Sequence, residues 1–144
     1  MLTEAQIERI AKHIIEGYAP LVIGLFGSYA IGAAHEGSDL DLFVIKQTVE
    51  RPVARRRIVQ RLLFGVMHKV DTPVFTPAEF EEGAYDEHMF QWVIVRQARL
   101  YCWSAEASRQ VPSLAARAER SARRRGSYGR VGTMGPETGA SIGP

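Results

Sequence analysis

Apolar and polar residues alternate with a helical period at the start of the chain. Five apolar residues fall on one face of a 3.6-residue repeat: Ile7, Ile10, Ala11, Ile14 and Ile15. Thr3 and Gln6 have the spacing of a capping box, in which side chain and backbone satisfy each other at a helix start. Gly17 is a typical stop signal. The pattern predicts an amphipathic helix that begins after Thr3 and ends at Gly17.

Short apolar runs with a different pattern follow this helix. Residues 20–26 (PLVIGLF) are continuously apolar and predict a buried strand. Residues 39–46 (DLDLFVIK) first alternate acidic and apolar residues and then become apolar, which predicts a strand whose first half faces something polar. Residues 69–75 (KVDTPVF) predict a third strand. Residues 100–103 suit either a closing strand or a packed end.

Helical patterns separate and follow these strands. The segment 53–67 places apolar residues on one face and arginines on the other, namely Ile58, Val59, Leu62, Leu63 and Val66 against Arg55, Arg56, Arg57 and Arg61. We expect these arginines to form a solvated face, with docking of an acidic partner as the alternative. Thr76, Pro77 and Glu79 have the chemistry of a second capped helix start. A further helix is expected near residues 86–97.

The order of these elements predicts an α/β (α+β) domain, with a small mixed sheet and flanking helices. We assign this domain to residues 1–104. Residues 105–144 form a basic and then glycine-rich tail, in which 105–125 should be weakly helical at best and 127–144 disordered. Seven arginines and three glutamates lie between Ser104 and Pro144, so the net charge of this tail is +4. The net charge of the whole chain is +2, and that of the first 103 residues is therefore −2.

Composition narrows the class of protein further. A mass of 16.0 kDa allows one domain, and no apolar stretch is long enough to cross a bilayer. The single Cys102 excludes an internal disulfide framework. A cytoplasmic protein without a membrane segment is the expectation. The basic tail could contact nucleic acid, but only weakly and without specificity.

Two aspartates stand out in the second predicted strand. Asp39 and Asp41 project from the same face, about 6.5–7 Å apart along the strand, while Leu40 and Leu42 point to the other face. Paired like charges favour a bound cation, and carboxylates suit Mg²⁺ or Mn²⁺. With Asp71 on a neighbouring strand, they could hold two metal ions for phosphoryl transfer. An isolated D-x-D pair can also be merely solvated.

A glycine–serine pair precedes these acids. Gly27 ends the first strand and permits a sharp backbone turn. The amides that follow it, together with the Ser28 hydroxyl, would point outward at the start of a helical turn, where backbone N–H groups attract phosphate. Gly27 and Ser28 are therefore candidate nucleotide-binding residues.

The stretch GSYAIGAAHEGSDLDLFVI resembles the signature of the DNA polymerase beta-type nucleotidyltransferase superfamily, and the segment VDTPVFTPAEFEE resembles its small stand-alone branch, the minimal nucleotidyltransferases. The resemblance covers about residues 2–103. It implies that Asp39 and Asp41 bind both of two metal ions, that Asp71 binds the catalytic metal and helps to activate an acceptor hydroxyl, and that Gly27 and Ser28 hold nucleotide phosphates.

The resemblance also implies a reaction and a partner. A nucleoside monophosphate, AMP from ATP, would pass to a hydroxyl with release of pyrophosphate. Minimal nucleotidyltransferases often pair with a HEPN-type RNase toxin, and some act as antitoxins by adenylylating a tyrosine on it. Two alternatives stay open: an antitoxin that neutralises its partner by contact alone, and transfer to a small molecule such as an aminoglycoside.

Overall fold

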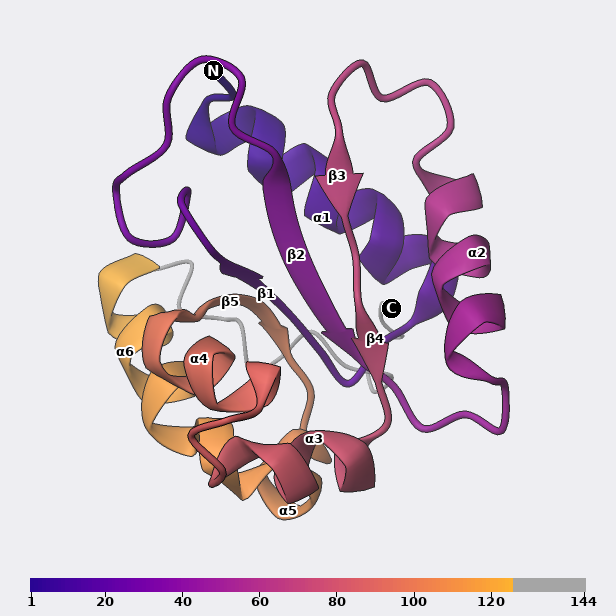
Figure 1. The fold of residues 1–144 in the computed structure, drawn as a ribbon, viewed down its shortest axis with the longest axis vertical. Helices are drawn as coiled ribbons and strands as arrows, with labels where there is room; N and C mark the ends of the chain where they lie inside the picture. Colours follow the sequence, from indigo (N-terminus) through magenta and orange to yellow (C-terminus); the bar gives the residue numbers. More distant parts are fainter. Residues whose placement is uncertain (126–144) are drawn as a thin grey trace.

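The computed structural model describes residues 1–125 and shows a five-stranded mixed sheet between layers of helices (Figure 1). The elements in chain order are α1 (Glu4–Tyr18), β1 (Val22–Phe26), β2 (Leu40–Ile45), α2 (Pro52–Leu62), β3 (Val70–Asp71), β4 (Val74–Phe75), α3 (Pro77–Ala84), α4 (Phe90–Gln97), β5 (Arg99–Trp103), α5 (Ala107–Gln110), the 3₁₀ turn η1 (Pro112–Leu114) and α6 (Ala115–Arg125). The predicted α/β architecture is confirmed. No helix within residues 1–125 has both the length and the apolar character needed to span a bilayer.

Strand β2 organises the sheet, whose order is β3-β2-β1-β5. The hairpin partner β1 runs antiparallel to β2 and also pairs antiparallel with β5. The short strands β3 and β4 both run parallel to β2, β3 beside its first half and β4 beside its second half. Residues 99–103 therefore form a strand of the sheet, which decides between the two structures expected for this segment.

The strand predicted over residues 69–75 is interrupted in its middle. Thr72 and Pro73 separate β3 from β4, because proline has no N–H group to donate to a ladder. The carbonyl of Pro73 still accepts a hydrogen bond from the amide of Val44, at 2.9 Å. The chain therefore stays beside β2 through the interruption, and β3 and β4 keep the direction of one strand.

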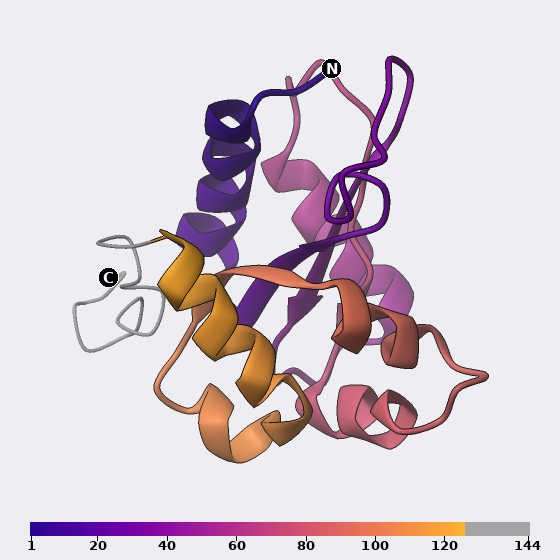
Figure 2. The same cartoon turned by 90° about the vertical axis from the view of Figure 1, so that its left-hand side faces the viewer.

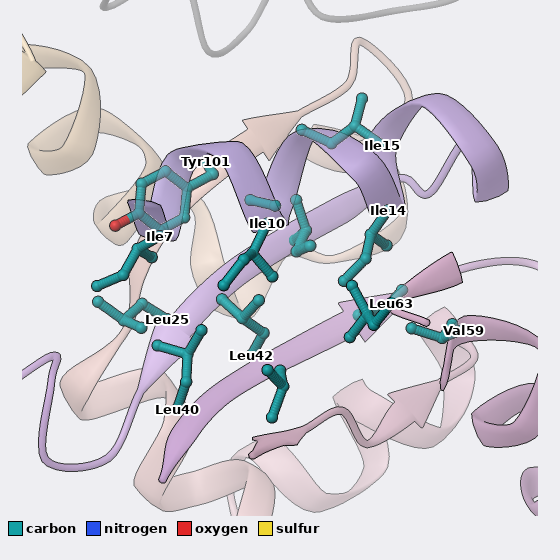
Figure 3. Packing of buried hydrophobic residues seen from close by; sticks show 14 of the residues in the cluster. Ile7, Ile10, Ile14, Ile15, Leu25, Leu40, Leu42, Val59, Leu63 and Tyr101 are labelled. Carbon is teal, nitrogen blue, oxygen red and sulfur yellow. The ribbon is translucent and has the colours of Figure 1, made fainter. Parts of the chain in front are cut away.

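Two hydrophobic clusters cover the two faces of the sheet. Leu40 and Leu42 of β2 pack with α1 and α2 in the first cluster (Figure 3). Phe43 and Ile45 join the second cluster, with residues of α3, α4 and the segment after β5. Figure 2 shows α1 on one side of the sheet and α3 and α4 on the other. Because side chains alternate along a strand, Asp41 shares the face of the second cluster.

Helix α1 begins as predicted but ends differently. Thr3 and Gln6 form the predicted capping box. The helix continues through Gly17 to Tyr18, and Ala19 adopts the left-handed conformation (φ 51°) that ends it. A Cβ atom on Gly17 would lie 2.6 Å from Cδ2 of Leu62. Gly17 therefore allows α1 and α2 to approach each other, and the prediction that it ends the helix was wrong.

The segment after Ser104 packs on the sheet, which differs from the expectation of weak helicity. Ala107, Val111 and Leu114 have no exposed surface and belong to the second cluster. The hydroxyl of Ser121 in α6 accepts a hydrogen bond from the amide of Leu100 in β5, at 2.9 Å. Small residues such as Ala118 can be buried at helical spacing without a large apolar side chain, and the sequence pattern gave them too little weight. The disorder expected for residues 127–144 lies outside the described residues.

Candidate active site

The three candidate acids lie at one end of the sheet, on two neighbouring strands. Asp41 is in register with Asp71 of the parallel strand β3 and with Phe26 of the antiparallel strand β1. Neighbouring strands lie about 4.8 Å apart, and residues in register project to the same face. Asp39 comes two residues before Asp41 and shares that face by alternation. The fold thus brings together Asp39, Asp41 and Asp71, which are separated by up to 32 positions in the sequence.

Two of these carboxylates lie near cationic side chains. The Lys69 ammonium is 3.7 Å from Oδ2 of Asp39, and Nη2 of Arg56 is 3.5 Å from Oδ1 of Asp71. The side chains of Asp39 and Asp71 are 48% and 49% exposed, respectively. Ion pairs at such distances and exposures contribute little to stability. These cations are therefore placed to offset negative charge without being fixed in position.

Asp41 is the most enclosed of the three acids. Its partial burial raises the pKa of its carboxyl, and the neighbouring charges of Asp71 and Asp39 raise this pKa further, while Lys69 opposes the shift. Each cause acts by destabilising the negative charge of Asp41. A bound cation would remove that penalty, so the local electrostatics favour cation binding at Asp41.

Gly27 is required at its position for two reasons. Its φ is +75°, in the left-handed region that L side chains rarely adopt. A Cβ atom there would lie 2.3 Å from Oδ2 of Asp41. The amide of Gly27 also donates a hydrogen bond to Oε1 of Gln97, at 2.9 Å, which ties the turn to the end of α4. The sequence predicted the need for a backbone turn, but not that the turn makes room for the Asp41 carboxylate.

Ser28 lies at the beginning of a series of tight turns rather than a regular helix. The amide of Ala30 donates to the carbonyl of Gly27, and the amide of Ala33 donates to the carbonyl of Ser28, both at 2.9 Å. This agrees with the expectation of about one helical turn. Ser28 is partly exposed and directly follows Gly27 at the end of β1.

The donor set is chemically suited to a hard divalent cation, although it is not assembled as a cage. Within residues 1–125, no three His, Cys, Asp or Glu side chains are gathered closely enough to hold an ion as they stand. The backbone register nevertheless puts three carboxylates on one face, and the two outer ones are half-exposed and able to rotate. Oxygen ligands of this kind suit Mg²⁺.

Comparison with known protein families decides the family of this chain. Residues 6–102 match the family described as "Nucleotidyltransferase domain". The chain belongs to this nucleotidyltransferase family. The match covers α1 through nearly all of β5 and includes Gly27, Ser28 and the three acids. No curated protein sequence matches the chain significantly.

Solved structures share the nucleotidyltransferase fold at low sequence identity. A crystal structure of a variant of the toxin–antitoxin complex MntA-HpeT is 20% identical with a TM-score of 0.54, over 86% of this chain and 94% of that one. A toxin–antitoxin structure with AMP-PNP is 20% identical with a TM-score of 0.52, over 82% and 92%. A nucleotidyltransferase structure from Sulfolobus solfataricus is 21% identical with a TM-score of 0.47, over 67% and 77%.

Sequence patterns missed several residues around the candidate site. The largest correction concerns Arg55, which was expected on a solvated face but is 5% exposed and bound to Glu79. Arg56, from the same predicted face, instead reaches Asp71. Lys69 and Gln97 were not singled out because isolated polar residues carry no periodic signal. For Lys69, the sequence signal that could have suggested a place near the acids was its position directly before β3, which carries Asp71.

A histidine also supports the loop that leads into Asp39. The Nε2 atom of His68 lies 3.0 Å from the carbonyl oxygen of Ser38, within hydrogen-bond distance. The ring of His68 packs edge-on against Tyr29, whose hydroxyl accepts a hydrogen bond from the amide of Leu2. These contacts hold the entry to β2 against the loop after β1, so they position Asp39 from a distance.

Proposed function

We propose that this chain is a Mg²⁺-dependent nucleotidyltransferase that transfers AMP from ATP to a hydroxyl group of a partner protein. The observation that carries this proposal is the register of Asp41 with Asp71, directly beside the turn at Gly27. The turn at Gly27 and the row of carboxylates lie at the same end of one sheet, which supports a phosphate-binding role for the turn. Phosphoryl transfer needs both of these features close together.

The metal requirement follows from the chemistry of the acids. Asp39 and Asp41 would hold two Mg²⁺ ions and Asp71 would hold one of them; Mn²⁺ suits the same ligands. When bound, the ions supply positive charge that offsets the phosphates and the charge that develops during transfer. Burial and acidic neighbours raise the pKa of the Asp41 carboxyl, so positive charge bound there would relieve the penalty on its ionised form.

Each residue of the site then has a defined task. The turn at Gly27 makes room for the Asp41 carboxylate, and the amides that follow it and the Ser28 hydroxyl offer donors to phosphate oxygens. Asp71 accepts the proton of the acceptor hydroxyl. The acceptor oxygen forms a bond to the α-phosphorus, the bond from that phosphorus to the oxygen that bridges to the β-phosphate breaks, and pyrophosphate leaves with the electron pair.

A partner protein is proposed as the acceptor because the site is open. The outer acids are about half exposed, so little of this chain encloses a bound nucleotide. Two of the similar structures are toxin–antitoxin complexes. One of them contains AMP-PNP, and in the other a pair of aspartates two positions apart is replaced by glutamates. These comparisons support a HEPN-type toxin as the partner and the D-x-D pair as the reaction centre.

The test is to co-express the chain with a candidate HEPN-type partner and to measure the partner's mass. We expect a gain of one AMP with the natural chain and none with Asp39→Asn/Asp41→Asn. Glu16→Gln is the matched control, since Glu16 lies on α1 on the far side of the sheet and forms only a long ion pair with Lys12.

Two outcomes would replace the proposal. A partner that is bound, inhibited and unmodified would support an antitoxin that acts by contact alone. Transfer of AMP to an aminoglycoside in the absence of any partner would support a small-molecule nucleotidyltransferase. Circular dichroism of the double variant is needed as a check, and its fold should be intact because the change removes like-charge repulsion.

A further inference from the structure

A groove of about 740 Å³ lies between α2, β4 and α3. This volume is typical of ligand-binding pockets. Arg56 lines the groove and also contacts Asp71, so the groove reaches the edge of the proposed reaction centre. The groove and the acids lie on the same face of the sheet, because Phe75 lines the groove and packs against the second cluster.

The wall of the groove is apolar and includes side chains that are exposed to solvent. Val53 and Met89 line it and are 67% and 43% exposed. Pro52, Pro73 and Phe75 complete this apolar surface. A cluster of exposed apolar residues in a concave site is typical of surfaces that bind another molecule.

The rim of the groove is acidic. Glu82 and Asp86 line it, are exposed, and form no ion pair with any of residues 1–125. The third acid, Glu79, is neutralised by Arg55 at 2.8 Å, and the one cation that lines the groove, Arg56, faces Asp71. The unpaired charge at this rim is therefore negative, which repels polyphosphate and attracts cationic groups.

The order of the strands fixes the side from which an acceptor must approach. Gly27 and Ser28 follow β1, Asp41 lies on β2, and Asp71 lies on β3, in that order across the sheet. In an in-line displacement the incoming oxygen and the leaving group are on opposite sides of the phosphorus. With pyrophosphate on the side of β1, the acceptor comes from the side of β3 and α2, where the groove is.

We propose that this groove is the acceptor subsite and that it receives a protein segment in which basic and apolar residues flank the reacting hydroxyl. The apolar wall contacts the aliphatic or aromatic side chains of the segment, and Glu82 and Asp86 pair with its cations. Arg56 links the groove to Asp71, which takes the hydroxyl proton in the reaction written above. This inference rests on the proposed function for the identity of the site, but the groove's preference for cationic segments can be measured separately.

The experiment uses the full chain and two synthetic peptides, without ATP or Mg²⁺. One peptide has a central tyrosine flanked by leucines and terminal arginines, and the other has glutamates in place of the arginines. Binding is measured by fluorescence anisotropy at several salt concentrations. We expect the natural chain to bind the arginine peptide at least tenfold more tightly, and this preference to weaken as salt rises.

Charge reversal gives the decisive comparison. Glu82→Lys/Asp86→Lys should invert the preference between the two peptides. Glu16→Lys/Glu119→Lys is the matched control, with the same change in net charge on α1 and α6, away from the groove. Val53→Ser tests the apolar wall at an exposed position of α2. It should lower the affinity for both peptides several-fold without altering the preference between them.

Several results would overturn the inference. These are binding of neither peptide by the natural chain, an unchanged preference after charge reversal, or an equal change in the control variant. If reversal instead tightened ATP binding and left the peptides unaffected, the groove would be a nucleotide site. An inverted peptide preference without any AMP transfer would retain the groove as a docking site and remove the proposed function, so the two failures are distinguishable.

Discussion

Arg55 and Arg56 are consecutive residues of α2, and each lies beside a carboxylate, but their surroundings differ. Arg55 is almost fully buried and binds both oxygens of Glu79, at 2.8 and 3.1 Å, as well as the carbonyls of Glu50 and Val74. Arg56 is 54% exposed and approaches Asp71 only to 3.5 Å. The first arginine joins α2 to β4 and α3, whereas the second can leave its partner at little cost.

The difference shows how a single helix can serve both the fold and the site. Arg55 uses its planar set of donors to satisfy several acceptors that are otherwise enclosed. Arg56 makes one long contact in water, where an ion pair contributes about 1 kcal/mol or less. Arg117 of α6 resembles Arg55, because its Nε atom donates to the carbonyl of Val95 at 2.8 Å. Bonds to backbone carbonyls of other elements therefore tie both Arg55 and Arg117 into the fold.

Removal of the segment that carries Arg117 should have the largest effect on stability. A chain that ends after Ser104 loses Val111 and Leu114, which are fully buried. Each large core side chain contributes about 2–5 kcal/mol, in a domain whose total stability is on the order of 5–15 kcal/mol. We expect loss of cooperative unfolding in thermal melts. Ending the chain after Arg125 is the control, since it keeps every described residue, and equal melting of the two truncated chains would contradict the packing of α6.

Substitution of Arg55 should have the next largest effect. Arg55→Met removes the buried guanidinium and leaves the carbonyl of Val74 and the carboxylate of Glu79 without their partner, at an expected cost of about 2–4 kcal/mol. Arg56→Met should change the free energy of unfolding by less than about 0.5 kcal/mol. Urea unfolding of both variants measures the contrast. Similar losses for the two would remove the distinction between a structural and a site arginine.

Arg56 should instead affect cation binding. Arg56→Gln removes a positive charge that competes with a metal at Asp71, so we expect Mg²⁺ affinity without nucleotide to rise about three- to tenfold. Arg57→Gln, on the exposed side of the same helix, is the matched control. Titration calorimetry measures the change. A lower affinity in the Arg56 variant would mean that this arginine organises the acids rather than competing for them.

The smallest effect concerns pH. The hydrogen bonds from Arg55 hold the pKa of Glu79 below its ordinary value of 4.5, and its bonds with Thr76 assist. A depressed folded pKa gives stability that is present above the unfolded pKa and is lost as pH falls through the folded value. The stability difference between the natural chain and Glu79→Gln should therefore shrink as pH falls below 4.5, by under about 1 kcal/mol because Glu79 is 43% exposed.

The same pH series in the Arg55→Met background sharpens the comparison. Without the guanidinium, most of the pH-dependent difference at Glu79 should disappear. If it persisted unchanged, the capping interaction with Thr76 rather than Arg55 would be its source.

Much of the fold was predictable because its signals are local. The capping boxes at Thr3 and Thr76 formed as their spacing indicated. The alternation in DLDLFVIK correctly placed Leu40 and Leu42 in one core and Asp41 on the other face. The predictions failed where the outcome depended on distant contacts, as with the burial of Arg55 against Glu79 and the packing of Leu114.

Strand alternation, helix caps and the resemblance of the D-x-D stretch were readable from neighbouring residues, since each depends on positions a few residues apart. They were sufficient to identify the fold class and to nominate Gly27, Ser28, Asp39, Asp41 and Asp71 as candidates. The contact between Gly27 and Asp41, the burial of Arg55 against Glu79, and the acidic groove between α2 and α3 arise between segments that are 14 or more positions apart. Such features depend on how the strands and helices pack in three dimensions, because burial and electrostatic environment are properties of the assembled fold and not of any one segment.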